Sequence, residues 1–519
     1  MRQTDSAMER RWGRRSIFAA LRQPGKLDPS DASSPSVASP SALRLLVPGS
    51  GLLLLGVIYL WLASLPYYYR FPKLHPSRMG HWATVSVGFT FALICGFGCY
   101  YAAWRIASQF APTRRRILLV IGVAAILSTI LAFTYPFLSD DMFYGIVGAR
   151  TFGCYRQNPF AVPPSRFIHD PFLPYAGWPD LTMPYGPLWV LISGTVAKIS
   201  DRGLLATVLA FKALNVSLFL LTTGLLARLL AKRTPRTALA GLVLWAWNPL
   251  VLVEVASSAH NDIVMITLIV AACSFAAARR ATWALLMLAL AVAAKYVAII
   301  LVPFFAIHFL RRHANWRAGV RALIPGAIVS ASALLALYLP FWVGWQTFGP
   351  LGEARYAYGS IIAAARYLLP RDHMLLHDTL LRGGALLVYG ICYIWLLRRT
   401  GRKLTDLFVI SYSALLFILL LWPFFMPWYT LWLVPIAALT KRPRLARQII
   451  VVTGAALATY LFQFFLRPAF RQSTDFWSTL SAVLVFGSLL LVTLAPLARN
   501  ALRRMMRRFR GSLRPALGT

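Results

Sequence analysis

The chain has 519 residues, of which 58% are hydrophobic and 13% are charged. This composition cannot supply the polar surface of a soluble protein of this size and predicts a polytopic membrane protein. The formal net charge of +37 does not indicate nucleic-acid binding, because the basic residues stand in short runs between apolar segments. Such runs are typical of cytoplasmic loops beside an anionic leaflet, so membrane lipid is the expected partner.

The first segment, residues 1–42, is basic and rich in Ser and Pro, which predicts a disordered cytoplasmic tail. Apolar runs follow near 43–65, 82–107 and 116–137, and each is long enough to span a membrane. If the tail is inside, the third run ends at the outer face. Two adjacent carboxylates then lie just beyond that face.

Residues 138–202 form a long external loop in this arrangement, rich in Pro, Tyr and Trp. Within it, residues 185–200 are apolar but short. If they crossed the membrane, every later arginine run would fall outside. If they lie on the outer leaflet instead, the later basic runs fall inside, as the positive-inside rule requires: 232–236, 279–280, 311–321, 398–403 and 441–447. We therefore predict a juxtamembrane helix at 185–200.

The rest of the chain is expected to be a bundle of apolar helices. Long runs lie near 203–230, 238–257, 322–345, 382–398, 404–423, 448–468 and 478–498, and shorter ones near 263–278, 281–294, 296–310 and 428–440. The predicted fold class is therefore all-α and polytopic, with about 12–14 transmembrane helices. These helices would form one domain over residues 43–498, followed by a basic cytoplasmic tail at 499–519.

The short runs 281–294 and 296–310 lie between arginine pairs that both fall inside. They must therefore rise into the membrane and return, with Lys295 near the apex. A lysine there costs about 2.5–3.5 kcal/mol if it faces lipid. Lys295 is expected to face an anion or a polar cavity, and the alternative is a side chain that snorkels to the outer interface.

An acidic pair, Asp140 and Asp141, follows the third apolar run directly. Because carboxylates are costly near lipid, this spot is expected to be wet, functional or both. The alternative is a solvated, acidic helix end. Tyr144 and Arg150 follow within the same aromatic, basic loop.

A second polar group stands in the motif SAHND, residues 258–262. His260, Asn261 and Asp262 are expected to be functional, and the alternative is a helix N-cap formed by Asn or Asp. Glu254 lies about two turns deeper in an apolar helix. There it must pair with another group or be protonated.

Two further features have two interpretations each. Lys212, inside the run 203–230, either snorkels or pairs with an acid. The stretch WPFFMPWYTLW, residues 422–432, contains Trp428 and Tyr429 and is either an interfacial belt or a surface on which sugar rings stack. The sequence has no P-loop, zinc-protease or nucleophilic-serine motif, and its five cysteines lack metal-ligand spacing.

Four motifs in this order carry a family resemblance: DDMFYGIVGARTFGCYRQNPF (140–160), PYGPLW (184–189), WNPLVLVEVASSAHND (247–262) and AKYVAIILVPF (294–304). The chain resembles the GT-C superfamily of polyprenol-phosphate-sugar-dependent glycosyltransferases, most closely the bacterial α-(1→6)-mannosyltransferase branch. The resemblance covers about residues 116–310. That branch usually has an aromatic residue in place of Gly145 and a glycine in place of Ala149. The two helices within 43–107 resemble an addition ahead of the common core.

The resemblance implies an integral membrane glycosyltransferase. Such an enzyme transfers a sugar, here mannose, from a polyprenyl-phosphate donor to a hydroxyl of a glycan or glycolipid acceptor, with inversion. It implies a bacterial plasma-membrane protein whose active site, in the loop 138–202, faces the periplasm. No cofactor is required; a divalent metal is compatible with the reaction, but no ligand cluster in the sequence demands one.

The resemblance also implies roles for particular residues. Asp140 aligns with the superfamily's catalytic base and Asp141 with its acidic neighbour, and their roles are not separated, because adjacent carboxylates shift each other's pKa. Lys295 and Arg150 are expected to bind the donor phosphate. The expected substrate-binding residues are Tyr144, Tyr185, Glu254, His260, Asn261, Asp262, Trp428 and Tyr429.

The alternative from a different functional class is a multi-pass transporter or lipid flippase. The helix count and the intramembrane Lys212 and Glu254 favour it. The sequence shows no inverted repeat, and the long aromatic loop is unlike a gated path. A scaffold protein, a third possibility, would leave the acidic pair unexplained.

Overall fold

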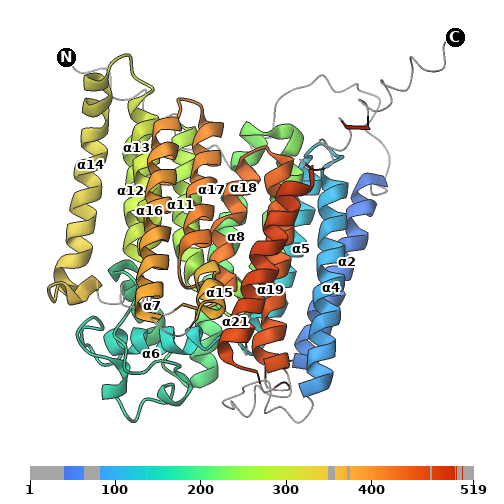
Figure 1. The fold of residues 1–519 in the computed structure, drawn as a ribbon, viewed down its shortest axis with the longest axis vertical. Coiled ribbons are helices and arrows are strands. Elements are labelled where there is room, and N and C mark those ends of the chain that lie inside the picture. Colours follow the sequence, from blue (N-terminus) through green and yellow to red (C-terminus); the bar gives the residue numbers. More distant parts are fainter. Residues whose placement is uncertain are drawn as a thin grey trace, which may run out of the picture.

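The computed structural model describes residues 40–63, 82–136, 138–348, 357–370, 374–467, 470, 472–496, 498 and 505–506. The tails predicted at 1–42 and 499–519 lie almost entirely outside these residues. The described residues form helices and isolated β-bridges, with no β-strand among them (Figure 1). An all-α, polytopic membrane protein is therefore confirmed.

The described helices fall into two length classes. Eight are long and apolar enough to cross a membrane, and a bent pair raises this number to nine. The other segments predicted as spans are apolar helices of 10–17 residues, with the first of them counted over Arg44–Leu60. The predicted total of about 12–14 therefore includes several helices that are shorter than a full membrane thickness.

Three N-terminal helices pack together at one edge of the bundle: α2 (Pro40–Ala63), α4 (Trp82–Ala107) and α5 (Arg114–Ala132) (Figure 1). The Thr113 hydroxyl caps α5 by accepting a hydrogen bond from the Arg116 backbone N–H. The chain leaves α5 at the lower end of the bundle in Figure 1 and enters the predicted loop 138–202 there.

Two short helices, α6 (Asp141–Gly153) and α7 (Pro187–Ile199), dominate this loop. Two 3₁₀ turns, η4 (Pro164–Arg166) and η5 (Leu173–Tyr175), lie between them. Helix α7 confirms the helix predicted at 185–200. It starts where it does because proline at its first position suits a helix start. In Figure 1, α6 runs across the end of the bundle rather than along it.

The predicted span 238–257 is not one straight helix. After α8 (Leu204–Arg233), the segments Pro235–Ala246 and Pro249–Ser257 meet at a 47° bend. Pro249 causes the break, because proline lacks a backbone N–H and disfavours helical geometry in the preceding residue. The Asn248 side chain then caps the new helix start by accepting from the backbone N–H groups of Leu250 and Val251.

The following helices confirm the predicted hairpin with Lys295 at its break. Helix α11 (Asp262–Ala277) leads into α12 (Ala281–Ala294), and the 3₁₀ turn η8 (Tyr296–Leu301) starts the return through α13 (Val302–Leu310). Lys295 caps α12 in an extended conformation, with φ −150°.

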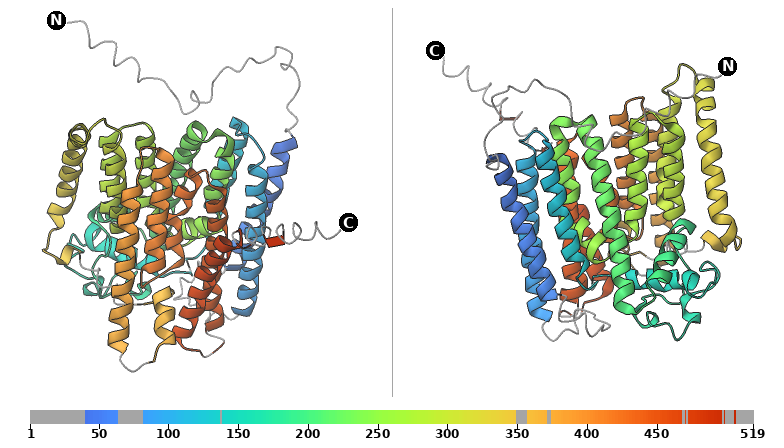
Figure 2. Two further views of the ribbon diagram at one scale, coloured as in Figure 1. Left: turned by 45° about the horizontal axis from the view of Figure 1, so that its top comes forward. Right: turned by 180° about the vertical axis from the view of Figure 1, so that it is seen from behind.

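The remaining described elements complete the bundle: α14 (Trp316–Tyr338), η9 (Leu339–Phe341), α15 (Ile361–Leu368), α16 (Met374–Arg399), α17 (Leu404–Leu421), η11 (Pro427–Trp432), α18 (Val434–Leu439), α19 (Pro443–Tyr460), the π turn η12 (Leu461–Leu466), α21 (Thr474–Ala482) and the π turn η13 (Val483–Gly487). Helix α14 stands at the outer edge of the bundle (Figures 1 and 2). Its exposed apolar side chains suit contact with lipid.

Basic segments gather at the end of the bundle opposite α6. Arg233 donates to the Ala277 carbonyl, and Arg311 donates to the carbonyls of Arg398 and Thr400. Figures 1 and 2 show the turns after α8, α13 and α16 at this end. The structure thus separates basic turns from the loop 138–202, as expected. Which end faces the cytoplasm stays a prediction.

Candidate active site

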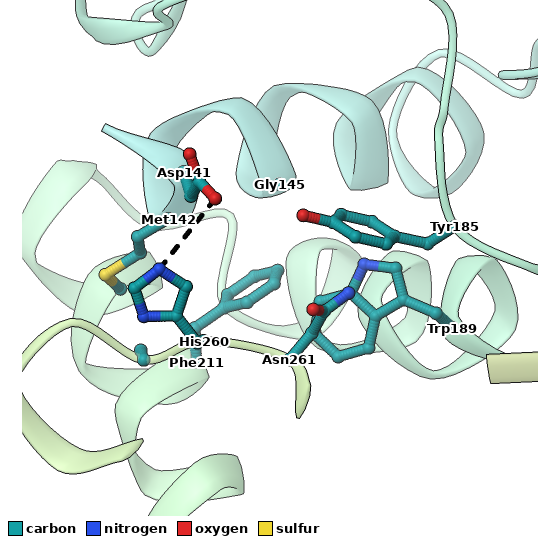
Figure 3. A pocket seen from close by; sticks show the side chains of 9 residues that line it. Asp141, Met142, Gly145, Tyr185, Trp189, Phe211, His260 and Asn261 are labelled. Atoms are coloured by element: carbon teal, nitrogen blue, oxygen red, sulfur yellow. Dashed lines mark ion pairs between the residues drawn. The ribbon is translucent and has the colours of Figure 1, made fainter. Parts of the chain in front are cut away.

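A small cavity lies where α6, α7, α8 and the turn before α11 meet, at the end of the bundle that carries α6. Figure 3 shows its lining: Asp141, Met142, Gly145, Tyr185, Trp189, Phe211, Ala259, His260 and Asn261. Asp141, Tyr185, His260 and Asn261 were predicted as site residues. Four segments far apart in the sequence therefore converge on one cavity.

The two adjacent aspartates have different surroundings. Asp140 is the N-cap residue of α6 and is exposed, whereas the Asp141 side chain is 16% exposed and lines the cavity. Successive helical residues project about 100° apart, so one carboxylate faces inward and the other does not. Burial raises the pKa of Asp141, and the nearby charges of His260 and Lys295 partly offset this effect.

His260 connects Asp141 to a second, fully buried carboxylate. Its Nε2 lies 3.8 Å from Asp141 Oδ2, and its Nδ1 lies 3.1 Å from Glu254 Oε2. The ring stacks on Trp428 with centroids 4.1 Å apart. Burial alone would lower the pKa of His260, but Glu254 and Asp141 outweigh it and raise that pKa.

Glu254 sits in a π turn, η7 (Val253–Ser257), and its side chain is 0% exposed. The Tyr460 hydroxyl on α19 donates to Glu254 Oε1 at 2.8 Å. After this turn, Ala259 adopts a left-handed conformation with φ 53°, which is uncommon for a residue other than glycine. The chain reversal at Ala259 brings His260 back beside Glu254.

The alternative for residues 260–262, a side-chain helix cap, is not what the structure shows. Asn261 is the N-cap residue of α11, but its side chain makes no capping hydrogen bond. Asp262 is fully buried, and its Oδ2 lies 2.7 Å from Lys295 Nζ, while its Oδ1 accepts from Trp432 Nε1 at 2.5 Å. Asp262 therefore serves as an ion-pair partner.

Lys295 faces an anion, as the hairpin argument predicts, and does not reach away from the protein. Besides Asp262, three aromatic rings surround its ammonium, at 5.3 Å for Tyr185, 5.8 Å for Tyr429 and 5.9 Å for Trp432. Tyr185 also lines the cavity. The lysine thus lies just behind one wall of the cavity.

Arg150 and Tyr144 hold the loop 138–202 together. Arg150 is 5% exposed, and its Nε and Nη1 pair with Asp170 at 2.7 Å and Asp201 at 2.5 Å. The Tyr144 hydroxyl donates to the Thr182 carbonyl at 2.7 Å. Neither side chain is among the residues that line the cavity, so their predicted substrate roles stay predictions and their visible role is to fold the loop.

Several residues at the site were missed by sequence reasoning. Trp189 and Phe211 line the cavity, and Trp432 and Tyr460 donate hydrogen bonds to the buried Asp262 and Glu254 behind it. Trp432 lies in the aromatic stretch 422–432, which the sequence already indicated as a candidate sugar-binding surface. Trp189 ends the motif PYGPLW (184–189), so its segment was also singled out. Phe211 and Tyr460 are aromatic residues in apolar helices, and nothing in such a context distinguishes them from core.

Lys212 has a backbone partner rather than an acid. It is fully buried, and its ammonium donates to the Thr134 carbonyl just after α5. The Thr134 hydroxyl in turn contacts Ser257 Oγ, in the turn that carries Glu254, at 2.5 Å. Lys212 therefore ties the segment leading to α6 to the rest of the site.

Among the described residues, no group of three or more His, Cys, Asp or Glu side chains is arranged to hold a metal ion. The expectation that no cofactor is required, and that a divalent metal is compatible with the reaction, is not tested by this observation. Both stay predictions.

Sequence matches relate this chain to known proteins. The model of a family described as "Alpha-(1->6)-mannopyranosyltransferase, N-terminal domain" matches residues 49–311. Alpha-(1->6)-mannopyranosyltransferase A of Mycobacterium tuberculosis (strain ATCC 25618 / H37Rv) is 26% identical over 431 residues, which cover 76% of this chain and 78% of that relative. No solved structure matches the chain. The family match includes the whole cavity and also the helices expected to precede the common core.

Proposed function

The chain belongs to the alpha-(1->6)-mannopyranosyltransferase family, and from this premise we propose that it transfers mannose from a polyprenyl-phosphate donor to a glycan or glycolipid hydroxyl. The proposal is carried by the position of Asp141, whose carboxylate lies at the wall of a cavity. His260 and the Lys295–Asp262 ion pair lie beside it. A cavity at the end of a helix bundle suits a donor whose lipid tail stays in the bilayer.

In the proposed reaction, Asp141 accepts the proton of the acceptor hydroxyl. The acceptor oxygen then forms a bond to the anomeric carbon of the sugar as the bond from that carbon to the phosphate oxygen breaks. Polyprenyl phosphate leaves, and this single displacement inverts the anomeric configuration. We assign the base to Asp141 rather than Asp140 because Asp141 faces the cavity. Burial favours this role, since a carboxylate with a raised pKa is a stronger proton acceptor.

We assign the departing phosphate to Lys295. Its ammonium carries three donors, so a bond to Asp262 leaves others for phosphate oxygens. A cation placed where negative charge develops stabilises the transition state by a few kcal/mol, on the order of 2.7–4 kcal/mol for one donor. Tyr185 touches both this lysine and the cavity, which supports a phosphate position between the two.

The assignment of the aromatic residues follows from what each one contacts. Tyr185 and Trp189 line the cavity and are the rings proposed to contact the sugar. Trp428 is 4% exposed and stacks on His260, and Tyr429 stacks on Trp432 with centroids 4.8 Å apart. Trp428 therefore packs against His260, and the stacked rings of Tyr429 and Trp432 pack beside Lys295. These contacts hold the two side chains in place.

The proposed location is a bacterial plasma membrane, with the cavity on the periplasmic side. The gathering of basic turns at the opposite end supports it, because cytoplasmic loops carry an excess of Lys and Arg. The transporter alternative has less support. Lys212 and Glu254, the intramembrane charges that favoured it, bond to Thr134 and Tyr460 within the fold.

The test is a transfer assay with the purified protein, radiolabelled polyprenyl-phosphate-mannose and a mannosyl acceptor. We expect labelled product with the polyprenyl donor and none with a nucleotide-linked mannose. Transfer from the nucleotide donor alone would overturn the lipid-donor proposal. Absence of transfer from either donor, to any of a set of mannosyl acceptors, would overturn the transferase proposal itself.

A further inference from the structure

We propose that Glu254 and His260 form a positioning dyad that holds Asp141 in its ionised state through the charge of the His260 ring, rather than binding the sugar or the phosphate. The proposal rests on the proposed function, because it assigns Asp141 to proton transfer. It replaces the expectation that Glu254 and His260 are substrate-binding residues. Tyr460 completes the arrangement by bonding the far oxygen of Glu254.

The His260 side chain is enclosed by other groups of the protein. Its Nδ1 faces Glu254 at 3.1 Å, and its ring lies against Trp428. Its backbone carbonyl accepts a hydrogen bond from Asn215 Nδ2 at 3.2 Å, and its backbone N–H donates to the Glu254 carbonyl. The side chain is 2% exposed. A ring fixed in this way directs its remaining nitrogen, Nε2, towards Asp141 and has no freedom to follow a substrate.

Glu254 does not reach the cavity. Its side chain is fully buried, it does not line the cavity, and both of its oxygens face groups of the protein, His260 and Tyr460. A buried carboxylate is costly unless it is paired. The local backbone is also unusual, since a π turn and a left-handed Ala259 place Glu254 and His260 side by side. Such features cluster at functional sites.

Electrostatic interactions couple Glu254, His260 and Asp141. A protonated His260 would stand between two carboxylates and neutralise one of them. The charged groups that face His260 and Asp141 from the packed elements are Glu254, Asp140, Asp262 and Lys295. Because Glu254 favours the imidazolium, and the imidazolium favours ionised Asp141, removal of the Glu254 charge should be felt at Asp141 through the ring.

The test compares transfer by the wild type and Glu254→Gln across pH. In the variant the pKa of His260 falls, so the ring is less often charged at a given pH, and the pKa of Asp141 therefore rises. The acidic limb of the kcat profile should move to higher pH by about one unit. We expect kcat at the optimum to fall by about 10-fold or more, because the His260 ring loses the carboxylate beside its Nδ1. The KM values for donor and acceptor should stay within about twofold, because neither residue binds substrate.

Three further variants separate this dyad from a packing effect. Glu254→Asp keeps the charge and should keep the position of the acidic limb while losing rate. Tyr460→Phe keeps the shape and should move the limb in the same direction as Glu254→Gln, by less. Asp378→Asn, which removes a carboxylate paired with Arg382 on α16, should leave the profile unchanged.

Raised KM values with an unmoved acidic limb in Glu254→Gln would overturn the proposal and return Glu254 to substrate binding. If Glu254→Gln does not accumulate, Tyr460→Phe provides the test. An acidic limb of its kcat profile at the wild-type pH would then overturn the dyad proposal.

The pKa of His260 can be measured without turnover, so it tests the dyad independently of the proposed function. The chain has eight histidines, so ¹⁵N-histidine labelling with a His260→Gln reference identifies the His260 signal in detergent. Its pKa should fall by about one unit or more in Glu254→Gln. An unchanged pKa would overturn the dyad whatever the enzyme transfers. A lowered pKa in a protein that transfers no mannose would overturn the proposed function and keep the dyad.

Discussion

At the residue scale, neighbouring side chains of one type have different surroundings. Asp140 and Asp141 are adjacent in the sequence, yet one is exposed at the start of α6 and the other lines the cavity beside His260. Helical geometry alone separates them, since each step along a helix turns the side chain by about 100°. The proposed chemistry therefore assigns unequal importance to the two carboxylates.

Asparagine substitutions test this inequality. Asp141→Asn should lower kcat by at least about 10²-fold, the lower range for a positioned acid–base group, because the amide cannot accept the acceptor proton. Asp140→Asn should lower it by less than about 10-fold. The measurement is transfer of labelled mannose at matched amounts of purified protein. A larger loss in Asp140→Asn would assign the base to Asp140, in agreement with the family resemblance, and would make Asp141 its neighbour.

Because Lys295 is paired with Asp262, substitution of the lysine should affect the stability of the protein as well as transfer. Lys295→Ala would leave Asp262, which is fully buried, without its cation. Breaking a buried pair in this way typically costs about 3–5 kcal/mol of stability. We therefore expect reduced accumulation and a lower unfolding temperature in addition to lost transfer.

A double variant separates stability from catalysis at this pair. In Lys295→Met with Asp262→Leu, both charges are replaced by apolar groups of similar size, which is often neutral or stabilising. We expect the unfolding temperature to recover towards the wild-type value, measured in detergent, while transfer stays lost. Recovery of both stability and transfer would show that the lysine serves the fold alone.

The sequence predicts the charged residues of this site better than it predicts their partners. Asp141, Glu254, His260 and Lys295 stand out because charge is costly against an apolar background. Arg150 stands out equally, yet the structure pairs it with two loop aspartates. Pairing depends on how distant segments pack, and hydrophobic periodicity carries no information about which acid meets which base.

At the element scale, the helix at 185–200 and the hairpin around Lys295 were predictable, because segment length and the placement of basic runs constrain them. The bend at Pro249 follows from a local rule that the apolar run 238–257 conceals. The π turn at Glu254 and the left-handed Ala259 carry no comparable signal. These irregular features position the proposed dyad, so the least predictable part of the backbone lies at the candidate site.

Glycines set the distance between the elements that form the cavity. A Cβ on Gly153 would lie 2.1 Å from the Gly194 carbonyl oxygen, and one on Gly186 would lie 2.1 Å from the Ala293 carbonyl oxygen. Helix α6 therefore packs backbone to backbone on α7, and the start of α7 packs in the same way on the end of α12, next to Lys295. These contacts bring Asp141, Tyr185 and Lys295 together.

We expect Gly153→Ala to push α6 away from α7. The added methyl group meets backbone, which cannot move aside as a side chain can, so the substitution should destabilise the protein by about 1–3 kcal/mol and lower transfer. Gly224→Ala on α8 is the matched control, because a Cβ there meets nothing within 4 Å. Thermal unfolding of both purified variants checks the prediction. Equal unfolding temperatures would show that α6 and α7 tolerate a wider separation.

At the scale of the whole molecule, the basic turns and the candidate active site lie at opposite ends of the bundle. The basic turns after α8, α13 and α16 lie at one end, and α6, α7 and the cavity lie at the other (Figures 1 and 2). If the donor is lipid-linked, as proposed, its phosphosugar must lie on the side where the cavity opens. The orientation in the membrane therefore decides which pool of donor the protein can use.

Cysteine labelling in intact cells tests this orientation. Ile168, in the loop 138–202, is 73% exposed, and Arg236, after α8, is also exposed. In a Cys154→Ser background, which removes the cysteine of that loop, a cysteine at Ile168 should react with a membrane-impermeant thiol reagent. A cysteine at Arg236 should react only after permeabilisation, because the positive-inside rule places the basic turns in the cytoplasm. Both should react in permeabilised cells, which controls for accessibility. The reverse pattern would place the cavity in the cytoplasm, where a lipid donor displayed on the outer leaflet could not reach Asp141.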